Sequence, residues 1–115
     1  MFAFEKFDVY IKAKSVFAEI TLFIENNRGL NSRIVDQLYR AALSIPLNIA
    51  EGAGRYSKPD KRNFYTIARG SVFECTAIID IMFGKKLMSA VQKDGFYNEL
   101  EEISKMLSGL INSLK

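Results

Sequence analysis

The sequence has 115 residues, 49% apolar and 25% charged, which is typical of one globular domain spanning residues 1–115 and not of a disordered chain. It has no His and a single Cys, which excludes Ser-His-Asp triads, His-ligated metals, disulfides within the chain and Cys-rich zinc sites. Lys and Arg total 16 and Asp and Glu total 13, so the net charge of +3 permits a nucleic-acid or acidic partner without requiring one.

The first segment with helical periodicity runs from about residue 8 to residue 27. Asp8 is a suitable N-cap, and Asn26, Asn27 and Gly29 are expected to end the helix. Its apolar residues recur every three or four positions and therefore form one stripe. The stripe consists of Val9, Ala13, Val16, Phe17, Ile20, Phe23 and Ile24.

The second segment begins with Asn31 or Ser32 as its cap and contains Pro46. A proline inside a helix removes a backbone donor and clashes with the preceding turn. The apolar spacing keeps its phase across Pro46, so we predict a bent helix and not two separate ones. Gly52 and Gly54 are expected to close it. The stripe consists of Ile34, Leu38, Ala41, Ala42, Ile45, Ile49 and Ala53.

The third segment starts with Ser57 as cap, and Asp60 three positions later resembles the partner in a capping box. Pro59 falls in the first turn, where a missing N–H does no harm, and Gly84 marks the expected end. The predicted inner stripe consists of Phe64, Ile67, Ala68, Ser71, Cys75, Ile78 and Met82.

The fourth segment starts between Ser89 and Gly95. Its stripe consists of Phe96, Leu100, Ile103, Leu107, Leu110, Ile111 and Leu114. Four helices joined by short loops predict an all-α fold, an antiparallel up-down four-helix bundle with a proline-bent second helix.

Antiparallel pairing around the turn near Tyr56 predicts that Ser44 lies beside Gly70 and Ser71. The same register brings Arg40 near Glu74. Apolar residues exceed one stripe per helix, which favours a second buried surface and therefore self-association. The surplus consists of Phe4, Phe7, Tyr10, Val72, Ile79 and Phe83.

The second segment also carries a line of polar residues at helical spacing, and two interpretations remain open. One is a recognition surface whose arginines bind phosphate. The other is a buried or interfacial set of ion pairs, with Arg40 as the partner of Glu74, that fixes the register of the helices or the packing of subunits. The line consists of Arg40, Ser44, Asn48, Glu51 and Arg55.

Basic and aromatic residues alternate around the turn between the second and third segments. Single-stranded nucleic acid is bound by this combination, because cations hold phosphates and aromatic rings stack on bases. An ordinary solvated turn is the alternative. The candidate nucleic-acid residues are Arg55, Tyr56, Lys58, Lys61, Arg62, Tyr65 and Arg69.

The stretch Arg40-Ala-Ala-Leu-Ser-Ile-Pro-Leu-Asn-Ile-Ala-Glu-Gly-Ala-Gly-Arg55, followed by Phe64-Tyr-Thr-Ile-Ala-Arg-Gly-Ser71 and Glu74, resembles the bacterial four-helix bundle proteins encoded by intervening sequences of 23S rRNA genes. Accessory proteins of diversity-generating retroelements are related to that family. The resemblance implies a ring-shaped homo-oligomer, a pentamer, associated with RNA or ribonucleoprotein. By position, the family's signature residues are Arg40, Ser44, Asn48, Glu51, Gly52, Arg55, Gly70, Ser71 and Glu74.

Together these observations predict a non-enzymatic, oligomeric binding protein that contacts RNA or ribonucleoprotein through the basic turn. The alternative is an oligomeric scaffold for protein partners without nucleic-acid affinity. No group of residues supplies a nucleophile, a base and oxyanion donors together, so we expect no catalytic residues, no metal and no cofactor. The N-terminus does not read as a signal peptide, and no stretch reads as a membrane span, so we expect a cytoplasmic protein.

Overall fold

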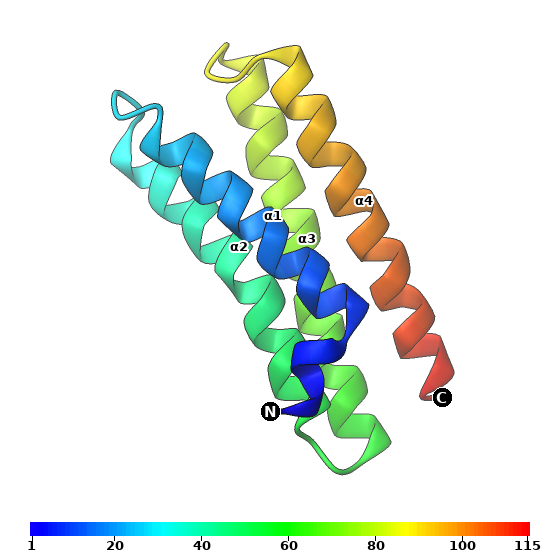
Figure 1. The fold of residues 1–115 in the computed structure, drawn as a ribbon. Coiled ribbons are helices and arrows are strands. Elements are labelled where there is room, and N and C mark those ends of the chain that lie inside the picture. Colours follow the sequence, from blue (N-terminus) through cyan, green and yellow to red (C-terminus); the bar gives the residue numbers. More distant parts are fainter.

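A computed structural model describes every residue from Met1 to Lys115. A short 3-10 helix, η1 (Ala3–Lys6), precedes four α-helices: α1 (Asp8–Glu25), α2 (Ser32–Ala53), α3 (Lys58–Gly84) and α4 (Ala90–Ser113). Successive helices run antiparallel, and α1 packs against α4 to close the bundle (Figure 1). The predicted all-α four-helix fold is therefore confirmed. None of the helices is long and apolar enough to cross a bilayer.

Local capping signals determine where three of the helices begin. The Asn31 side chain accepts a hydrogen bond from the Arg33 N–H at 2.8 Å, and the Ser57 Oγ accepts from the Asp60 N–H at 3.1 Å. Such bonds satisfy backbone donors that the first helical turn leaves free. Ser89 and Gln92 form a reciprocal capping box at the start of α4. One predicted cap is wrong, because Asp8 is the first helical residue of α1 and Phe7 precedes it as the cap.

The core is one continuous apolar cluster in which all four helices take part. The stripes predicted for the first, second and fourth segments supply most of it. The stripe predicted for α3 is confirmed at Ala68, Cys75 and Met82, which are fully buried. It is wrong elsewhere, because Tyr65, Val72 and Ile79 are buried one position later, whereas Ile67 is 44% exposed. Val72 and Ile79 therefore belong to the core and not to the predicted surplus.

Pro46 is buried inside α2, and the helix continues through it without a break. The prediction that the chain stays helical across Pro46 is therefore confirmed, while a bend at this point stays a prediction. Gly52 lies inside α2, and Gly54 is the C-cap, so only one of the two predicted helix-ending glycines ends the helix.

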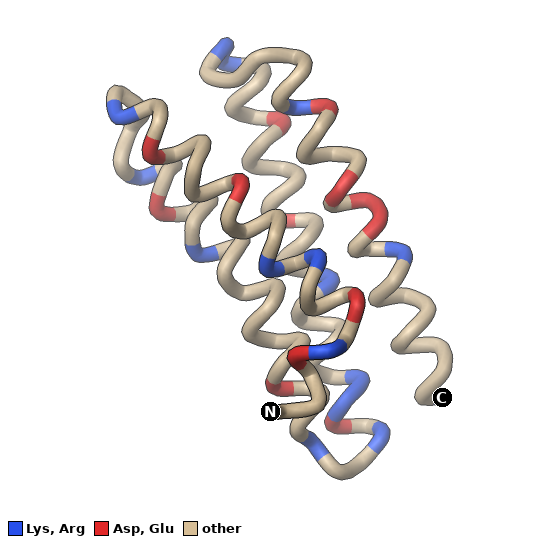
Figure 2. Tube along the Cα trace, viewed as in Figure 1, with Lys and Arg blue, Asp and Glu red and all other residues tan.

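The α2–α3 turn, η1 and the C-terminus gather at one end of the bundle, while the other two turns lie at the opposite end (Figure 1). Several Lys and Arg residues cluster around the α2–α3 turn (Figure 2). Topology thus brings the basic turn and the aromatic N-terminal segment together, although they are about fifty residues apart in sequence.

Candidate nucleic-acid interface at the α2–α3 turn

The α2–α3 turn is short and held by backbone hydrogen bonds. The Gly54 N–H donates to the carbonyl oxygen of Ala50 at 3.2 Å, and the Arg55 N–H donates to that of Gly52 at 3.2 Å. Ser57 then caps α3. Tyr56, between these two anchored ends, has its side chain fully exposed. The turn therefore presents an aromatic ring to solvent on a well-defined backbone.

Arg55 lies between a carboxylate and an aromatic ring. Its guanidinium is 3.2 Å from Glu51 Oε2 and 4.5 Å from the centre of the Phe64 ring. The ion pair is exposed, and its strength is therefore limited by solvent. Because an arginine has five donors, it keeps N–H groups for a phosphate while it holds Glu51.

Lys61 and Arg62 are bound to the ends of neighbouring helices. The Lys61 ammonium donates to the carbonyl oxygen of Ala53 at 3.0 Å, which satisfies the C-terminus of α2. Arg62 donates to the carbonyl oxygen of Leu114 and so connects α3 to the last residues of the chain. Neither side chain forms an ion pair with a carboxylate.

Arg69 lies further along α3 and faces α4. Its Nε donates to Ser108 Oγ at 2.8 Å, and its guanidinium lies 4.8 Å from the centre of the Phe73 ring. It therefore connects two helices and is not part of the turn. Lys58, in contrast, is exposed and forms no ion pair or side-chain hydrogen bond within the chain.

Tyr65 does not have the predicted role. Its side chain is 2% exposed and lies in the core, so in this structure it presents no face to a base. Burial also raises the pKa of its phenol. The ring packs over Gly52, where an added Cβ would lie 2.7 Å from Tyr65 Cε1. Tyr56 is therefore the one predicted stacking residue whose ring is accessible.

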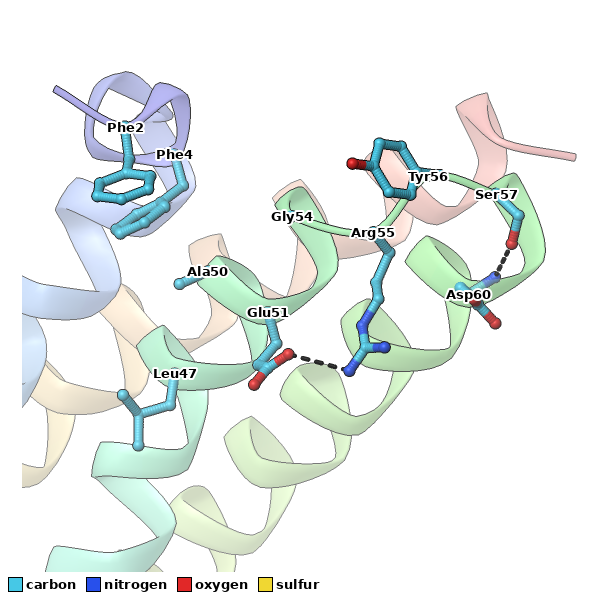
Figure 3. A pocket seen from close by; sticks show the side chains of 10 residues that line it. All are labelled: Phe2, Phe4, Leu47, Ala50, Glu51, Gly54, Arg55, Tyr56, Ser57 and Asp60. Carbon is cyan, nitrogen blue, oxygen red and sulfur yellow. Dashed lines mark hydrogen bonds and ion pairs between the residues drawn. The ribbon is translucent and has the colours of Figure 1, made fainter.

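A hollow of about 780 Å³ opens beside the turn, between η1 and the end of α2 (Figure 3). The rings of Phe2 and Phe4 stack with centroids 6.0 Å apart and 22° between their planes. The remaining wall includes Leu47, Arg55, Tyr56 and Asp60. Phe2 and Phe4 are not among the predicted site residues, although Phe4 belongs to the predicted apolar surplus. A single 3-10 turn has no periodicity that would indicate which way these rings point.

The signature residues in the middle of α2 and α3 meet along the outer seam between these helices. Ser44 Oγ and Ser71 Oγ are 2.8 Å apart, which confirms the predicted register. Asn48 donates to the backbone carbonyl of Ser44 at 2.8 Å and to its Oγ at 2.9 Å. Gly70 is exposed, and an added Cβ there would contact nothing within 4 Å. The fold of the single chain therefore gives no steric reason for a glycine at this position.

Arg40 and Glu74 line the same shallow hollow of about 440 Å³ on this seam. Both are exposed, and no ion pair joins them. The predicted nearness of Arg40 and Glu74 is therefore confirmed, but a buried ion pair between them within the chain is not formed. The other alternative, an ion pair at an interface between subunits, stays a prediction.

The one thiol of the chain, Cys75, is buried in the core. Burial, followed by the charge of Glu74, raises the pKa of the Cys75 thiol to about 12. A thiol with such a pKa remains protonated at neutral pH and is a poor nucleophile. No group of three or more His, Cys, Asp or Glu side chains is placed to hold a metal ion.

The comparisons with known proteins agree with this geometry. The structure superimposes on a protein of unknown function from the S23 ribosomal protein family of Bacteroides thetaiotaomicron, with a TM-score of 0.83 and 24% sequence identity, over 90% of this chain and 97% of that one. At this identity the likeness shows the fold alone. No curated protein sequence matches the chain. The family model described as 23S rRNA-intervening sequence protein matches residues 5–109, so the chain belongs to that family.

Proposed function

We propose that this protein is a non-enzymatic, homo-oligomeric binding protein that contacts RNA or a ribonucleoprotein through the α2–α3 turn. The observation that carries the proposal is the charge of that turn. Between residues 51 and 62, four cationic side chains accompany two carboxylates, a net charge of +2. Lys61 and Arg62 donate to backbone carbonyls and pair with no carboxylate, so no ion pair cancels their charge.

The family supports the same proposal. Its description connects its members with intervening sequences of 23S rRNA, and an RNA or ribonucleoprotein partner fits that setting. The resemblance to accessory proteins of diversity-generating retroelements points to nucleic-acid-bound partners as well. A pentameric ring, which the resemblance also implies, would repeat the turn around its axis and raise the local potential without raising the charge of each subunit.

The proposal is tested by titrating the purified protein with a 23S rRNA fragment and with an unrelated RNA, at low and at physiological salt. Phosphate contacts release counterions, so the affinity should fall steeply as salt rises. A preference for one RNA would show recognition of its shape. Absence of binding to either RNA at low salt would refute the proposal.

Charge reversal locates the contact. The double variant Arg55→Glu/Lys58→Glu should lose RNA binding and remain helical, because both side chains are exposed. Lys85→Glu/Lys86→Glu is the matched control, since it changes the net charge equally at the opposite end of the bundle. Equal losses in the two variants would mean that net charge, and not the turn, governs binding.

A scaffold for protein partners is the second candidate function, and the outer seam of α2 and α3 favours it. Ile67, whose carbonyl oxygen accepts a hydrogen bond from Ser71 Oγ, is 44% exposed there. Apolar side chains beside an unobstructed glycine permit the close approach of another helix. If RNA does not bind at low salt while the oligomer persists, this candidate replaces the first.

A further inference from the structure

We propose that the hollow between η1 and the α2–α3 turn receives one unpaired base of a single-stranded RNA segment, with Tyr56 and the Phe2–Phe4 pair as its stacking surfaces. This inference rests on the proposed function and specifies the form of RNA that the turn contacts. It assigns a binding role to the N-terminal segment, which the basic turn alone does not require.

The aromatic side chains carry the first step of the argument. Phe2 is 75% exposed and Tyr56 fully exposed, although burying rings of this size is favourable. Phe2 and Phe4 lie nearly parallel, one over the other (Figure 3), while Phe4 packs edge-on against Tyr10 with ring centroids 4.9 Å apart. Flat, exposed rings on an anchored backbone are what base stacking uses, and stacking tolerates any base.

The second step is the charge around the hollow. Glu51 on its wall is paired with Arg55, which leaves Asp60 as a carboxylate without an ion pair. Lys58 lies between Tyr56 and Asp60 in sequence and has no partner in the chain. A nucleotide strand has the complementary distribution, because its base offers N–H donors to a carboxylate and its phosphates lie outside, near cations.

The charge also decides against an apolar peptide as the occupant. The lining itself holds one cation, Arg55, and two carboxylates, and the other cations of the turn lie outside it. A peptide would gain from the apolar wall but would make no use of those outer cations. The volume of about 780 Å³ is typical of sites for small organic groups. The hollow therefore fits a planar group that carries negative charge beside it.

Leucine and phenylalanine substitutions at Tyr56 separate stacking from general hydrophobic contact. Leucine keeps an apolar side chain and removes the ring face, whereas phenylalanine keeps the face. Tyr56→Leu should bind a fluorescein-labelled single-stranded RNA roughly 5- to 150-fold more weakly than the parent. Tyr56→Phe should bind like the parent, and Phe2→Leu should weaken binding. Phe73→Leu is the control, because that ring is also exposed but lies on α3 away from the hollow.

Two further measurements complete the test. The same RNA as a duplex should bind the parent more weakly, because its bases are already stacked in pairs. The RNA carrying 5-iodouridine should crosslink on irradiation to the peptide that contains Tyr56.

The outcomes distinguish this inference from the proposed function. If Tyr56→Leu and Phe2→Leu bind single strands like the parent, while Arg55→Glu/Lys58→Glu still abolishes binding, the base site is wrong and the RNA-binding function stands. Equal affinity of the parent protein for single-stranded and duplex RNA would likewise show that the base site is wrong and would leave the RNA-binding function intact. If the parent binds no RNA at low salt, both proposals fail together.

Discussion

Gly52 is a residue at which α2 packs tightly against α3. A glycine inside a helix costs about 0.5–1 kcal/mol relative to alanine, so its presence there needs a steric reason. An added Cβ would lie 2.7 Å from Tyr65 Cε1 and 3.1 Å from Phe64 Cβ. The glycine therefore lets Tyr65 enter the core beside the candidate interface, a role different from the helix-ending one predicted from the sequence.

Gly52→Ala should lower the free energy of unfolding by about 1–3 kcal/mol, because the methyl group overpacks a filled site. Gly109→Ala in α4 is the matched control: its Cβ would meet nothing within 4 Å, so the change should raise stability by about 0.5–1 kcal/mol. Urea denaturation followed by circular dichroism measures both. A Gly52→Ala protein as stable as the parent would show that Tyr65 can move aside.

Glu99 is a carboxylate whose environment disfavours its charge. Partial burial and the hydrogen bond and charge of Glu19 raise its pKa to about 6, against the opposing effect of Lys12. The folded protein therefore holds more protons than the unfolded chain between about pH 4.5 and 6. Stability should fall as the pH rises through this window and stay lower above it.

Glu99→Gln removes this charge and should raise the melting temperature at pH 7.5, with little change at pH 4, where the carboxyl group of the parent is protonated. Glu101→Gln is the control, because that exposed side chain pairs only with Lys105 across one helical turn. Thermal melts at both pH values provide the test. An equal shift at pH 4 and pH 7.5 would contradict the assigned cause.

At the scale of the elements, the α3–α4 turn contains a strained residue. Lys86 adopts a φ of 62°, and no other non-glycine residue in the chain has a positive φ. This left-handed conformation costs an L-residue roughly 1–2 kcal/mol. The turn retains it because the Leu87 N–H reaches the carbonyl oxygen of Met82 at 2.9 Å and closes α3.

Lys86→Gly should raise the free energy of unfolding by up to about 1 kcal/mol, because glycine adopts this φ without strain. The control is Lys85→Gly at the preceding position, where φ is −88° and glycine relieves nothing. Lys85→Gly should be neutral or destabilising. Comparing the chemical denaturation midpoints of the two variants checks the prediction, which a loss of stability in Lys86→Gly would contradict.

The helices differ in how much of their structure could be predicted. The starts of α2, α3 and α4 follow from Asn31, Ser57 and Ser89, whose side chains act within three residues. The inward face of α3 could not be chosen by periodicity, because Phe64 and Tyr65, or Ile78 and Ile79, offer two apolar stripes one residue apart. Packing against Gly52 selects Tyr65, and that contact depends on two helices at once.

At the scale of the whole molecule, the outer seam of α2 and α3 is notable for its residues. The packing of a single chain does not explain why an apolar side chain and a glycine are exposed there. The half-exposed Ile67 and the unobstructed Gly70 would suit contact with a second copy of the chain. Ile67→Glu should therefore shift the protein from oligomer to monomer while its helicity persists. Val91→Glu, at another highly exposed apolar position, should not. Analytical ultracentrifugation would decide, and a parent protein that is monomeric at micromolar concentration would refute self-association.

The candidate interface was predictable only in part, because it is assembled by the whole fold. Arg55, Tyr56 and Lys58 are adjacent in sequence, and their composition already indicated a binding turn. The positions of Lys61 and Arg62 depend on the C-terminal ends of other helices, which no local pattern specifies. Phe2 and Phe4 join the site only because the up-down topology returns α2 to the end where the chain begins.

The four helices differ in how extensively they contact their neighbours, and this difference should affect the rates at which their amide hydrogens exchange. The contact between α1 and α4 is the least extensive of those between neighbouring helices, and that between α2 and α3 is the most extensive. Protection of amide hydrogens follows the free energy of local opening. Amides of α1 should therefore exchange with deuterated solvent before those of α2 and α3. In solution the α2–α3 hairpin would act as the durable unit of the molecule, and α1 as the part that opens first.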